Sequence, residues 1–175
     1  MTGFIIPSNS KYLLCILNSK LIVFLMELYA ISRRGGYLEY KTQYISKLPI
    51  KDIEPSEQKP FIEKADLMLS LNNDLQDQSQ KFQRTIQRKF ELEVLPKKLQ
   101  DWYSLSYTDF IKELGKLKIK LTLSQEAEWE DYFTSEATKL NAIKTQINAT
   151  DNAIDAMVYE LYGLSKEEIE IVENS

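Results

Sequence analysis

A basic, aromatic turn with two glycines is the stretch of this sequence best suited to binding chemistry. Arg33 and Arg34 carry guanidinium groups that fork onto phosphates or onto the edge of a guanine. Glycine lets a backbone approach closely, tyrosine adds stacking and hydrogen-bonding surface, and lysine attracts phosphates. The residues predicted to contact double-stranded DNA are Arg33, Arg34, Gly35, Gly36, Tyr37, Tyr40, Lys41 and Lys47. The alternative is a solvated helix end whose arginines balance the helix dipole.

The charge distribution places positive charge in the same part of the chain. The 175-residue sequence has a formal net charge of −4, which argues against a wholly basic nucleic-acid binder. Residues 1–50 carry six Lys and Arg against two acids, a net charge of +4, and the remainder carries 16 against 24, a net charge of −8. A basic N-terminal part on an acidic body favours local contact with a polyanion, and ordinary charge scatter is the alternative.

Much catalytic chemistry is excluded by residue types that the sequence lacks. It has no histidine and a single cysteine, Cys15, so Ser–His pairs, Cys–His pairs, Cys/His zinc sites and disulfides within the chain cannot form. Its five glycines never form GxG, and its isolated prolines exclude the Asn/Asp-Pro-Pro-aromatic motif of amino-methyltransferases. We expect no catalytic residue and no metal or cofactor site in this chain, and a cytoplasmic location.

Two other charged sets have simpler explanations than a site. Asp52, Glu57 and Lys59 fit the D…ExK pattern of metal-dependent nucleases, but the pattern is common by chance and acids at a helix start complement its dipole. A second basic set lies towards the end of a long helical stretch and comprises Lys81, Arg84, Arg88, Lys89, Lys97 and Lys98. A solvated helix face is the preferred explanation for this second set.

An apolar stretch at residues 12–31 has the length needed to cross a bilayer. Asn18, Ser19 and Lys20 lie at its centre, and Glu27 lies further on; these residues are costly in hydrocarbon. We therefore expect no membrane span. The stretch instead predicts two buried helices that meet at Asn18 and Ser19, either of which can cap the second helix.

The N-terminal third predicts a few short strands beside helix. Residues 3–6 resemble the end of a strand, residues 10–32 are helical, and residues 37–50 alternate weakly enough for one or two short strands. Because the chain begins on a strand end, we expect it to be a fragment of a longer polypeptide.

The rest of the chain predicts long helices. The first runs from about Ser56 to about Leu95, before Pro96. Ser106 caps a short helix that Gly115 ends, and Trp102, Tyr103, Tyr107 and Phe110 form a local aromatic core. A second long helix opens at the Thr122-x-x-Gln125 box and ends at Gly163, and Ser165 caps a last short helix.

Both long helices carry apolar residues in steps of three and four, which is typical of a coiled-coil seam. The first seam is Phe61, Ala65, Met68, Asn72, Leu75, Ser79, Phe82 and Ile86, and the second is Phe133, Ala137, Leu140, Ile143, Ile147, Thr150, Ile154, Met157 and Leu161. Two seams joined by a compact connection predict an antiparallel helical pair.

Four stretches resemble the TaqI-like C-terminal specificity family of restriction–modification enzymes. YLLCILNSKLIVFLM resembles its LLxxLNSKL helix, and YISKLPI resembles its closing strand with a Leu-Pro-Ile ending. SEQKPFIEKADLMLSL is similar to the helix that follows the recognition domain in type I specificity subunits. NAIDAMVYELYGLSKEEIEIVE resembles the ending of fused type II enzymes, which favours a fused type II enzyme over a type I subunit.

The resemblance implies a mainly α (α+β) fold in which residues 1–52 are the C-terminal part of a DNA target-recognition domain. Residues 53–175 would form a coiled-coil spacer and docking region, with a short helical insertion around residues 97–121. The chain would position a methyltransferase or endonuclease on its DNA target without catalysing a reaction. S-adenosylmethionine and Mg are expected in the catalytic part of the enzyme, outside this chain. That methyltransferase or nuclease part is an expected partner of the chain.

Two other functions remain open. A coiled-coil interaction or dimerisation module would pair the two seams between chains and leave the arginine turn incidental. A nuclease centred on Asp52, Glu57 and Lys59 would cleave DNA in the presence of a divalent metal.

Overall fold

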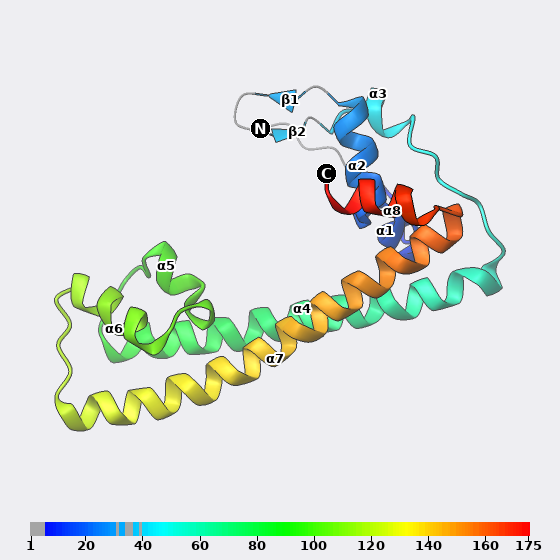
Figure 1. The fold of residues 1–175 in the computed structure, drawn as a ribbon. Helices are drawn as coiled ribbons and strands as arrows, with labels where there is room; N and C mark the ends of the chain where they lie inside the picture. Colours follow the sequence, from blue (N-terminus) through cyan, green and yellow to red (C-terminus); the bar gives the residue numbers. More distant parts are fainter. Residues whose placement is uncertain (1–5, 31, 34–36, 39) are drawn as a thin grey trace. The chain divides into compact units, whose positions relative to one another are not determined.

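The computed structural model describes residues 6–30, 32–33, 37–38 and 40–175, with the backbone alone described at 32–33 and 37–38. The chain forms two compact units, each described by itself below. Unit 1 comprises Met1–Met68 and Ala149–Ser175, and unit 2 comprises Leu69–Asn148. The fold is mainly helical, as the sequence predicts (Figure 1).

Two long helices, of 35 and 40 residues, dominate the order of elements. In chain order the described elements are α1 (Lys11–Asn18), α2 (Lys20–Tyr29), β1 (Ser32–Arg33), β2 (Tyr37–Leu38), α3 (Thr42–Ile45), α4 (Pro55–Lys89), α5 (Lys97–Gln100), the 3-10 helix η1 (Trp102–Ser104), α6 (Tyr107–Lys116), α7 (Leu123–Tyr162) and α8 (Lys166–Glu173). Each long helix contributes one part to unit 1 and the other part to unit 2.

The core of unit 1 joins segments from the two ends of the chain. Ile16 of α1 and Met26 of α2 are fully buried. They belong to one apolar cluster with Phe61 at the start of α4 and Val158 near the end of α7. Helix α2 also packs on α8, so residues 11–29 fold against the last quarter of the sequence (Figure 1).

Helices α1 and α2 are separated by a break at Ser19, as the sequence predicts. Within the described residues no single helix is long and apolar enough to cross a bilayer. Together α1 and α2 meet that length and composition requirement, but they are bent by 61° with respect to each other. Tyr12, Ile16 and Ile22 from this pair are buried in the core of unit 1.

The core of unit 2 is aromatic and confirms the predicted cluster around Trp102. The Trp102 ring is fully buried and stacks on Phe82 of α4, with 3.6 Å between ring centroids. Phe110 of α6 lies 4.9 Å from Phe133 of α7, also between centroids. The compact connection is therefore held against both long helices by ring packing, since aromatic pairs add to the energy of burial.

The two long helices pack together, as the seams predict. In unit 1 Phe61 and Ala65 are buried in one cluster with Ile154, and in unit 2 Phe82 lies 6.1 Å from Phe133 between ring centroids. Most seam positions are buried or half-buried, and the first seam departs at one place, where Leu71 is buried in place of Asn72.

Beyond residues 37–38, the strands expected over residues 37–50 are not formed, and that prediction is wrong. Residues 37–38 pair with residues 32–33 in a ladder two residues long, and Thr42–Ile45 is a helical turn. Tyr44 and Leu48 are both buried and lie four residues apart, which suits a helical turn rather than the two-residue period of a strand. The expected strand end at residues 3–6 falls on positions of which only residue 6 is described, and Ile6 lies outside any strand.

Helix starts agree with the sequence better than helix ends. The hydroxyls of Ser106 and Ser165 accept the predicted N-terminal hydrogen bonds of α6 and α8. However, α4 ends at Lys89 rather than near Leu95, because Glu91 adopts a left-handed backbone with φ of 52°. Helix α6 likewise continues through Gly115, and the left-handed residue that follows it is Lys118, with φ of 61°.

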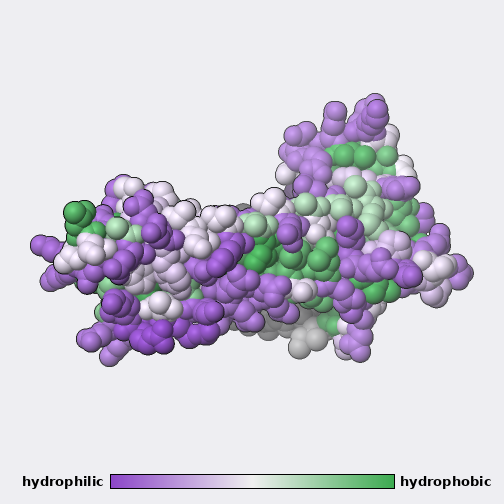
Figure 2. All heavy atoms as spheres, turned by 90° about the horizontal axis from the view of Figure 1, so that it is seen from below, coloured by the Kyte–Doolittle hydropathy of each residue, from purple (hydrophilic) through white to green (hydrophobic). Residues whose placement is uncertain are grey.

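Exposed hydrophobic residues are more frequent in unit 1. Leu28 and Ile171 are the most exposed large hydrophobic side chains described there, at 64% and 59%. On the face shown in Figure 2, hydrophilic residues cover most of unit 2, whereas hydrophobic residues are more frequent over unit 1. Isolated hydrophobic side chains are ordinary on protein surfaces.

The two glycines in helical regions predict opposite effects of a methyl group on stability. Gly163 has φ of +70°, so Gly163→Ala should destabilise the protein by about 1 kcal/mol, because alanine is strained in this conformation. Gly115 lies inside α6 with no atom within 4 Å of an added Cβ, so Gly115→Ala should stabilise it by about 0.5–1 kcal/mol.

Urea unfolding can measure both variants. Both tryptophans of the chain, Trp102 and Trp129, lie in unit 2, so their fluorescence reports that unit, and far-UV circular dichroism reports the whole chain. An equal effect of the two substitutions, in sign and size, would contradict the assigned backbone conformations.

Candidate nucleic-acid interface

The predicted DNA-contacting turn connects two short strands, β1 and β2, that pair with each other. Ser32 pairs with Leu38 and Arg33 pairs with Tyr37 in an antiparallel register, so the backbones of Arg33 and Tyr37 lie opposite each other. The predictions for Arg34, Gly35 and Gly36 fall outside the described residues, as do those for the side chains of Arg33 and Tyr37. DNA contact by these five residues stays a prediction.

The other three predicted residues lie around α3. Tyr40 precedes the helical turn and is 47% exposed. Lys41 is the N-cap residue of α3 with an extended backbone, and Lys47 follows the turn and is exposed. The structure therefore places Lys41 and Lys47 at opposite ends of one short helix, whose Tyr44 side chain anchors it in the core of unit 1. Their contact with DNA is likewise untested.

Two tyrosines hold the segment that follows α3. The Tyr12 hydroxyl donates to the carbonyl oxygen of Lys51 at 2.6 Å. The Tyr162 hydroxyl donates to the carbonyl oxygen of Pro49 at 2.5 Å and accepts from the backbone N–H of Lys51 at 3.2 Å. The Lys51 amine donates in turn to the carbonyl oxygen of Leu161 at 2.7 Å. These bonds fasten the Leu-Pro-Ile ending to α1 and to the end of α7.

The junction between α1 and α2 is capped by a residue distant in the sequence. Ser19 is buried, and the side chains of Asn18 and Ser19 both donate to carbonyl groups of α1, so the prediction that either caps α2 is wrong. Instead, the backbone N–H of Lys20 donates to Oδ1 of Asp155 on α7 at 2.8 Å. The first turn of a helix has free N–H groups that need an acceptor, and here the carboxylate of α7 provides it.

A charged network surrounds this bond. Asp155 is only 3% exposed, its Oδ2 has no hydrogen-bond partner among the described residues, and Lys20 Nζ lies 3.9 Å from that oxygen. Lys20 Nζ also contacts Glu173 Oε2 of α8 at 2.5 Å, and the Tyr159 hydroxyl donates to Glu173 Oε1 at 2.7 Å. Lys20 thus connects α2 to both α7 and α8.

Burial and hydrogen bonding move the pKa values of the two carboxylates in opposite directions. Burial raises the pKa of Asp155 and outweighs the hydrogen bond from Lys20 that lowers it. The hydrogen bonds from Lys20 and Tyr159 lower the pKa of Glu173. Asp155 is therefore the member of the network whose ionised form is least favoured by its surroundings.

The residues that form these hydrogen bonds and ion pairs were not identified as functional from the sequence. The sequence did contain a clue, because Asp155, Tyr159, Tyr162 and Glu173 all belong to the ending that resembles fused type II enzymes, and Lys20 belongs to the LNSK motif. The motifs could not reveal that they contact each other, since Lys20 and Asp155 are 135 residues apart in the sequence.

The single thiol of the chain has a structural environment. Cys15 is buried in unit 1, and its Sγ lies 3.2 Å from the carbonyl oxygen of Phe61, to which it donates. Burial raises the pKa of the Cys15 thiol to about 11, so the thiolate is scarce at neutral pH. Cys15 is therefore a packing residue.

Of the residues of the alternative nuclease site, Asp52 precedes α4, and Glu57 and Lys59 lie near its start. Glu57 is in the first turn of α4, and its Oε2 accepts from the backbone N–H of Glu54 at 3.2 Å, as expected of an acid that complements a helix start. In the part of the chain that the structure describes, no group of three or more acidic or cysteine side chains is arranged to hold a metal ion.

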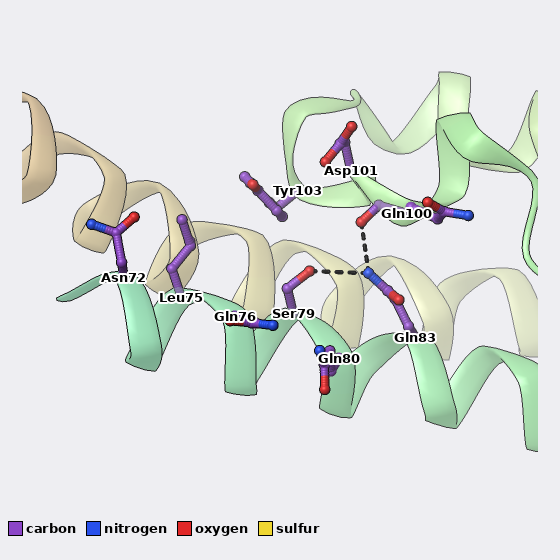
Figure 3. A pocket seen from close by; sticks show the side chains of 9 residues that line it. All are labelled: Asn72, Leu75, Gln76, Ser79, Gln80, Gln83, Gln100, Asp101 and Tyr103. Atoms are coloured by element: carbon purple, nitrogen blue, oxygen red, sulfur yellow. Dashed lines mark hydrogen bonds between the residues drawn. The ribbon is translucent and has the colours of Figure 1, made fainter. Parts of the chain in front are cut away.

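Unit 2 contains a polar groove of about 420 Å³ beside α4 (Figure 3). Its lining residues are Asn72, Leu75, Gln76, Ser79, Gln80, Gln83, Gln100, Asp101 and Tyr103. The Gln83 amide donates to Ser79 Oγ at 3.3 Å and to the carbonyl oxygen of Gln100 at 2.7 Å, so its NH₂ group is used within the protein. This bond connects α4 to the last residue of α5 at the wall of the groove.

Two family models match the chain on either side of residues 51–53. Residues 3–50 match the TaqI-like C-terminal specificity domain. Residues 54–158 match a family described as Domain of unknown function (DUF8810). No match was found among curated proteins or among solved structures. The first match supports the resemblance for residues 3–50 and indicates a DNA-recognition role in a restriction–modification enzyme.

The cap between Lys20 and Asp155 predicts a loss of stability on truncation. Asp155→Ala should destabilise the protein by about 1–2 kcal/mol, because the N–H of Lys20 loses its acceptor in a part-buried site. Asp155→Asn keeps an oxygen acceptor without the charge and is the matched control, with an expected loss of stability below about 0.5 kcal/mol. Urea unfolding followed by circular dichroism measures both, and equal stability of wild type and Asp155→Ala would contradict the role of the cap.

The raised pKa of Asp155 predicts a pH dependence of the same pair of proteins. A carboxyl whose pKa is raised on folding stabilises the fold at low pH and loses that contribution as the pH rises through the raised pKa. The unfolding free energy of wild type should therefore fall relative to Asp155→Asn as the pH rises above 3.8, the ordinary pKa of an aspartic acid. Urea titrations of both proteins between acid and neutral pH test this, and a constant or opposite difference would show that Asp155 is not destabilised by burial.

Proposed function

The chain belongs to the family described as Domain of unknown function (DUF8810), and we propose that it serves as the DNA sequence-recognition part of a restriction–modification enzyme. The observation that carries the proposal is the match of residues 3–50 to the TaqI-like C-terminal specificity domain. The basic turn at residues 33–36 lies inside that match, and the exposed Tyr40 and Lys47 follow it.

In this proposal the recognition residues contact bases and phosphates while the helices hold them in place. Arg33 and Arg34 supply bidentate contacts to a guanine edge or to phosphates, and Lys41 and Lys47 supply phosphate contacts. The hydrogen bonds of Tyr12, Tyr162 and Lys51 support such a role, because they fix the segment after α3 to α1 and α7. Residues held by a supported segment keep a defined position on DNA.

We further propose that catalysis resides in other parts of the enzyme. The sequence has no histidine and no GxG motif, and Cys15 is buried with a raised pKa, so the chain offers little from which to build a nucleophile or cofactor loop. Methyl transfer with S-adenosylmethionine, and cleavage with Mg, would be carried out by a methyltransferase or endonuclease part that this chain positions. The fused type II form remains the preferred parent.

A dimerisation module receives less support from the packing. The seam residues that would pair between chains are already in contact within one chain, as for Phe82 with Phe133 in unit 2. Pairing between chains through these seams would first have to separate them, at the cost of the apolar area that they bury.

DNA binding of the full chain tests the proposed function. A labelled duplex titrated across a salt series should bind weakly, and the affinity should fall as salt increases. Arg33→Ala/Arg34→Ala should lower the affinity by about tenfold or more and reduce the slope of log K against log salt by about two if both arginines contact phosphates.

The control for this experiment removes two lysines that already have carboxylate partners. Lys112 Nζ lies 3.0 Å from Asp109, and Lys116 Nζ lies 2.6 Å from Glu113, so Lys112→Ala/Lys116→Ala lowers the net charge by the same amount without removing unpaired cations. Binding that is unchanged in Arg33→Ala/Arg34→Ala, or lowered equally in the control, would reject the arginine turn as the recognition element.

A further inference from the structure

Four positively charged side chains without carboxylate partners follow one another along the last turns of α4. Lys81, Arg84, Arg88 and Lys89 are all exposed, and none forms an ion pair within the described part of the chain. Lys81, Arg84 and Arg88 are spaced by three and four residues, so they lie on one face of the helix. We call these four residues the α4 ridge.

Four other lysines of unit 2 pair with neighbouring acids, whereas Lys97, Lys118, Lys120 and Lys144 form no ion pair in the described structure. Lys98 and Lys116 contact Glu113 at 3.6 and 2.6 Å, Lys112 contacts Asp109, and Lys139 contacts Glu136. The feature that distinguishes the α4 ridge is that three cations without ion pairs lie on one face of one helix. Asp77 precedes Lys81 by one turn, where an acid can pair with a lysine, yet the two form no ion pair in the described structure.

Helix stability accounts for only part of the α4 ridge. Arg84 and Arg88 are like charges at i and i+4, which destabilise a helix rather than stabilise it. Basic residues in the last turn do complement the helix dipole, and this explains Arg88 and Lys89. The effect falls off within that turn, so Lys81 and Arg84 gain little from it.

The α4 ridge borders a groove that exposes both guanidinium groups. Arg84 and Arg88 line a hollow of about 440 Å³ together with Gln87, Leu92 and two acids, Glu91 and Glu93. Glu91 has the left-handed backbone that ends α4, and the Gln87 amide donates to the carbonyl oxygen of Glu93 at 3.3 Å. The turn after α4 is therefore fixed against the helix, beside the two arginines.

Acidic residues lie near the α4 ridge without forming ion pairs with it. Phe90 packs on Trp129, which brings the acid-rich start of α7 close to the end of α4. The acids there are Glu126, Glu128, Glu130 and Asp131. None of these residues, nor Glu91 or Glu93, forms an ion pair with the α4 ridge in the described structure.

We propose that the α4 ridge binds the sugar–phosphate backbone of duplex DNA independently of sequence, an inference that rests on the proposed function. From Lys81 to Lys89 the helix rises about 12 Å, and duplex DNA presents roughly one phosphate charge per 1.7 Å of its axis. Two guanidinium groups without internal partners match phosphate geometry, because each can donate two parallel hydrogen bonds. The long helices thereby add affinity for DNA, while residues 3–50, which match the specificity domain, discriminate between DNA sequences.

The test compares Arg84→Gln/Arg88→Gln with Lys112→Gln/Lys116→Gln in the full chain, on two duplexes of unrelated sequence across a salt series. The ridge variant should bind both duplexes about three- to tenfold more weakly at low salt, with the slope of log K against log salt reduced by about two. The lysine control should bind like wild type. Circular dichroism and tryptophan fluorescence verify that both variants are folded.

Each other outcome separates the two proposals. Equal losses in the ridge variant and the lysine control would overturn the α4 ridge as a site, because net charge alone would explain them. A ridge variant that binds like wild type, beside a weakened Arg33→Ala/Arg34→Ala, would overturn the α4 ridge and leave the proposed function standing. The reverse result would keep the α4 ridge and reject the arginine turn, and no duplex binding at low salt would overturn both.

Discussion

The hydrogen bond from the backbone of Lys20 to the carboxylate of Asp155 is the contact on which the arrangement of unit 1 depends. It provides the N-terminal acceptor that α2 lacks locally, because the Ser19 hydroxyl is turned back to α1. A cap supplied by a neighbouring residue would stabilise α2 in any surroundings. A cap supplied by α7 stabilises α2 only when the two ends of the chain are folded together. Formation of α2 and packing of residues 11–29 on α7 are therefore coupled.

Burying the carboxylate of Asp155 costs desolvation free energy that an apolar side chain at this position would not cost. Asp155 keeps one oxygen without a hydrogen-bond partner among the described residues, and its pKa is raised by burial. An apolar residue would avoid that desolvation but could not accept the N–H of Lys20. A shift of α2 along α7 by one residue would separate the N–H of Lys20 from the carboxylate of Asp155, so this hydrogen bond selects one register. The surrounding apolar contacts depend less on the exact alignment of the two helices.

The sequence predicted the structural features that depend on neighbouring residues. It failed for the features that depend on contacts between residues distant in the sequence. The caps at Ser106 and Ser165 depend on residues three apart, and the seams depend on a repeating step, so both could be derived from the pattern. The strands over residues 37–50 were wrong, because the core selects Tyr44 and Leu48 at a helical spacing from a weakly alternating segment. The ends of α4 and α6 were misplaced, because Glu91 and Lys118 take the left-handed conformation where the sequence pointed to Pro96 and Gly115. The partnership of Lys20 with Asp155 could not be derived at all, since no local rule connects residues so far apart.

The positions of the motifs indicate how such a chain could change its DNA target without losing its fold. The motifs by which this sequence resembles the TaqI-like specificity family and the fused type II enzymes include the residues of these contacts: Lys20 in LNSK, Pro49 in the Leu-Pro-Ile ending, and Tyr162 in LYGL. The proposed DNA-contacting residues lie between those anchors, at positions that carry none of these hydrogen bonds. Substitution of Tyr40 or Lys47, both exposed, alters the surface offered to DNA and leaves the anchors of unit 1 intact. Truncation of Asp155 or Tyr162 would instead remove hydrogen bonds that fasten this segment to α7, beside the anchors at Tyr12 and Tyr44.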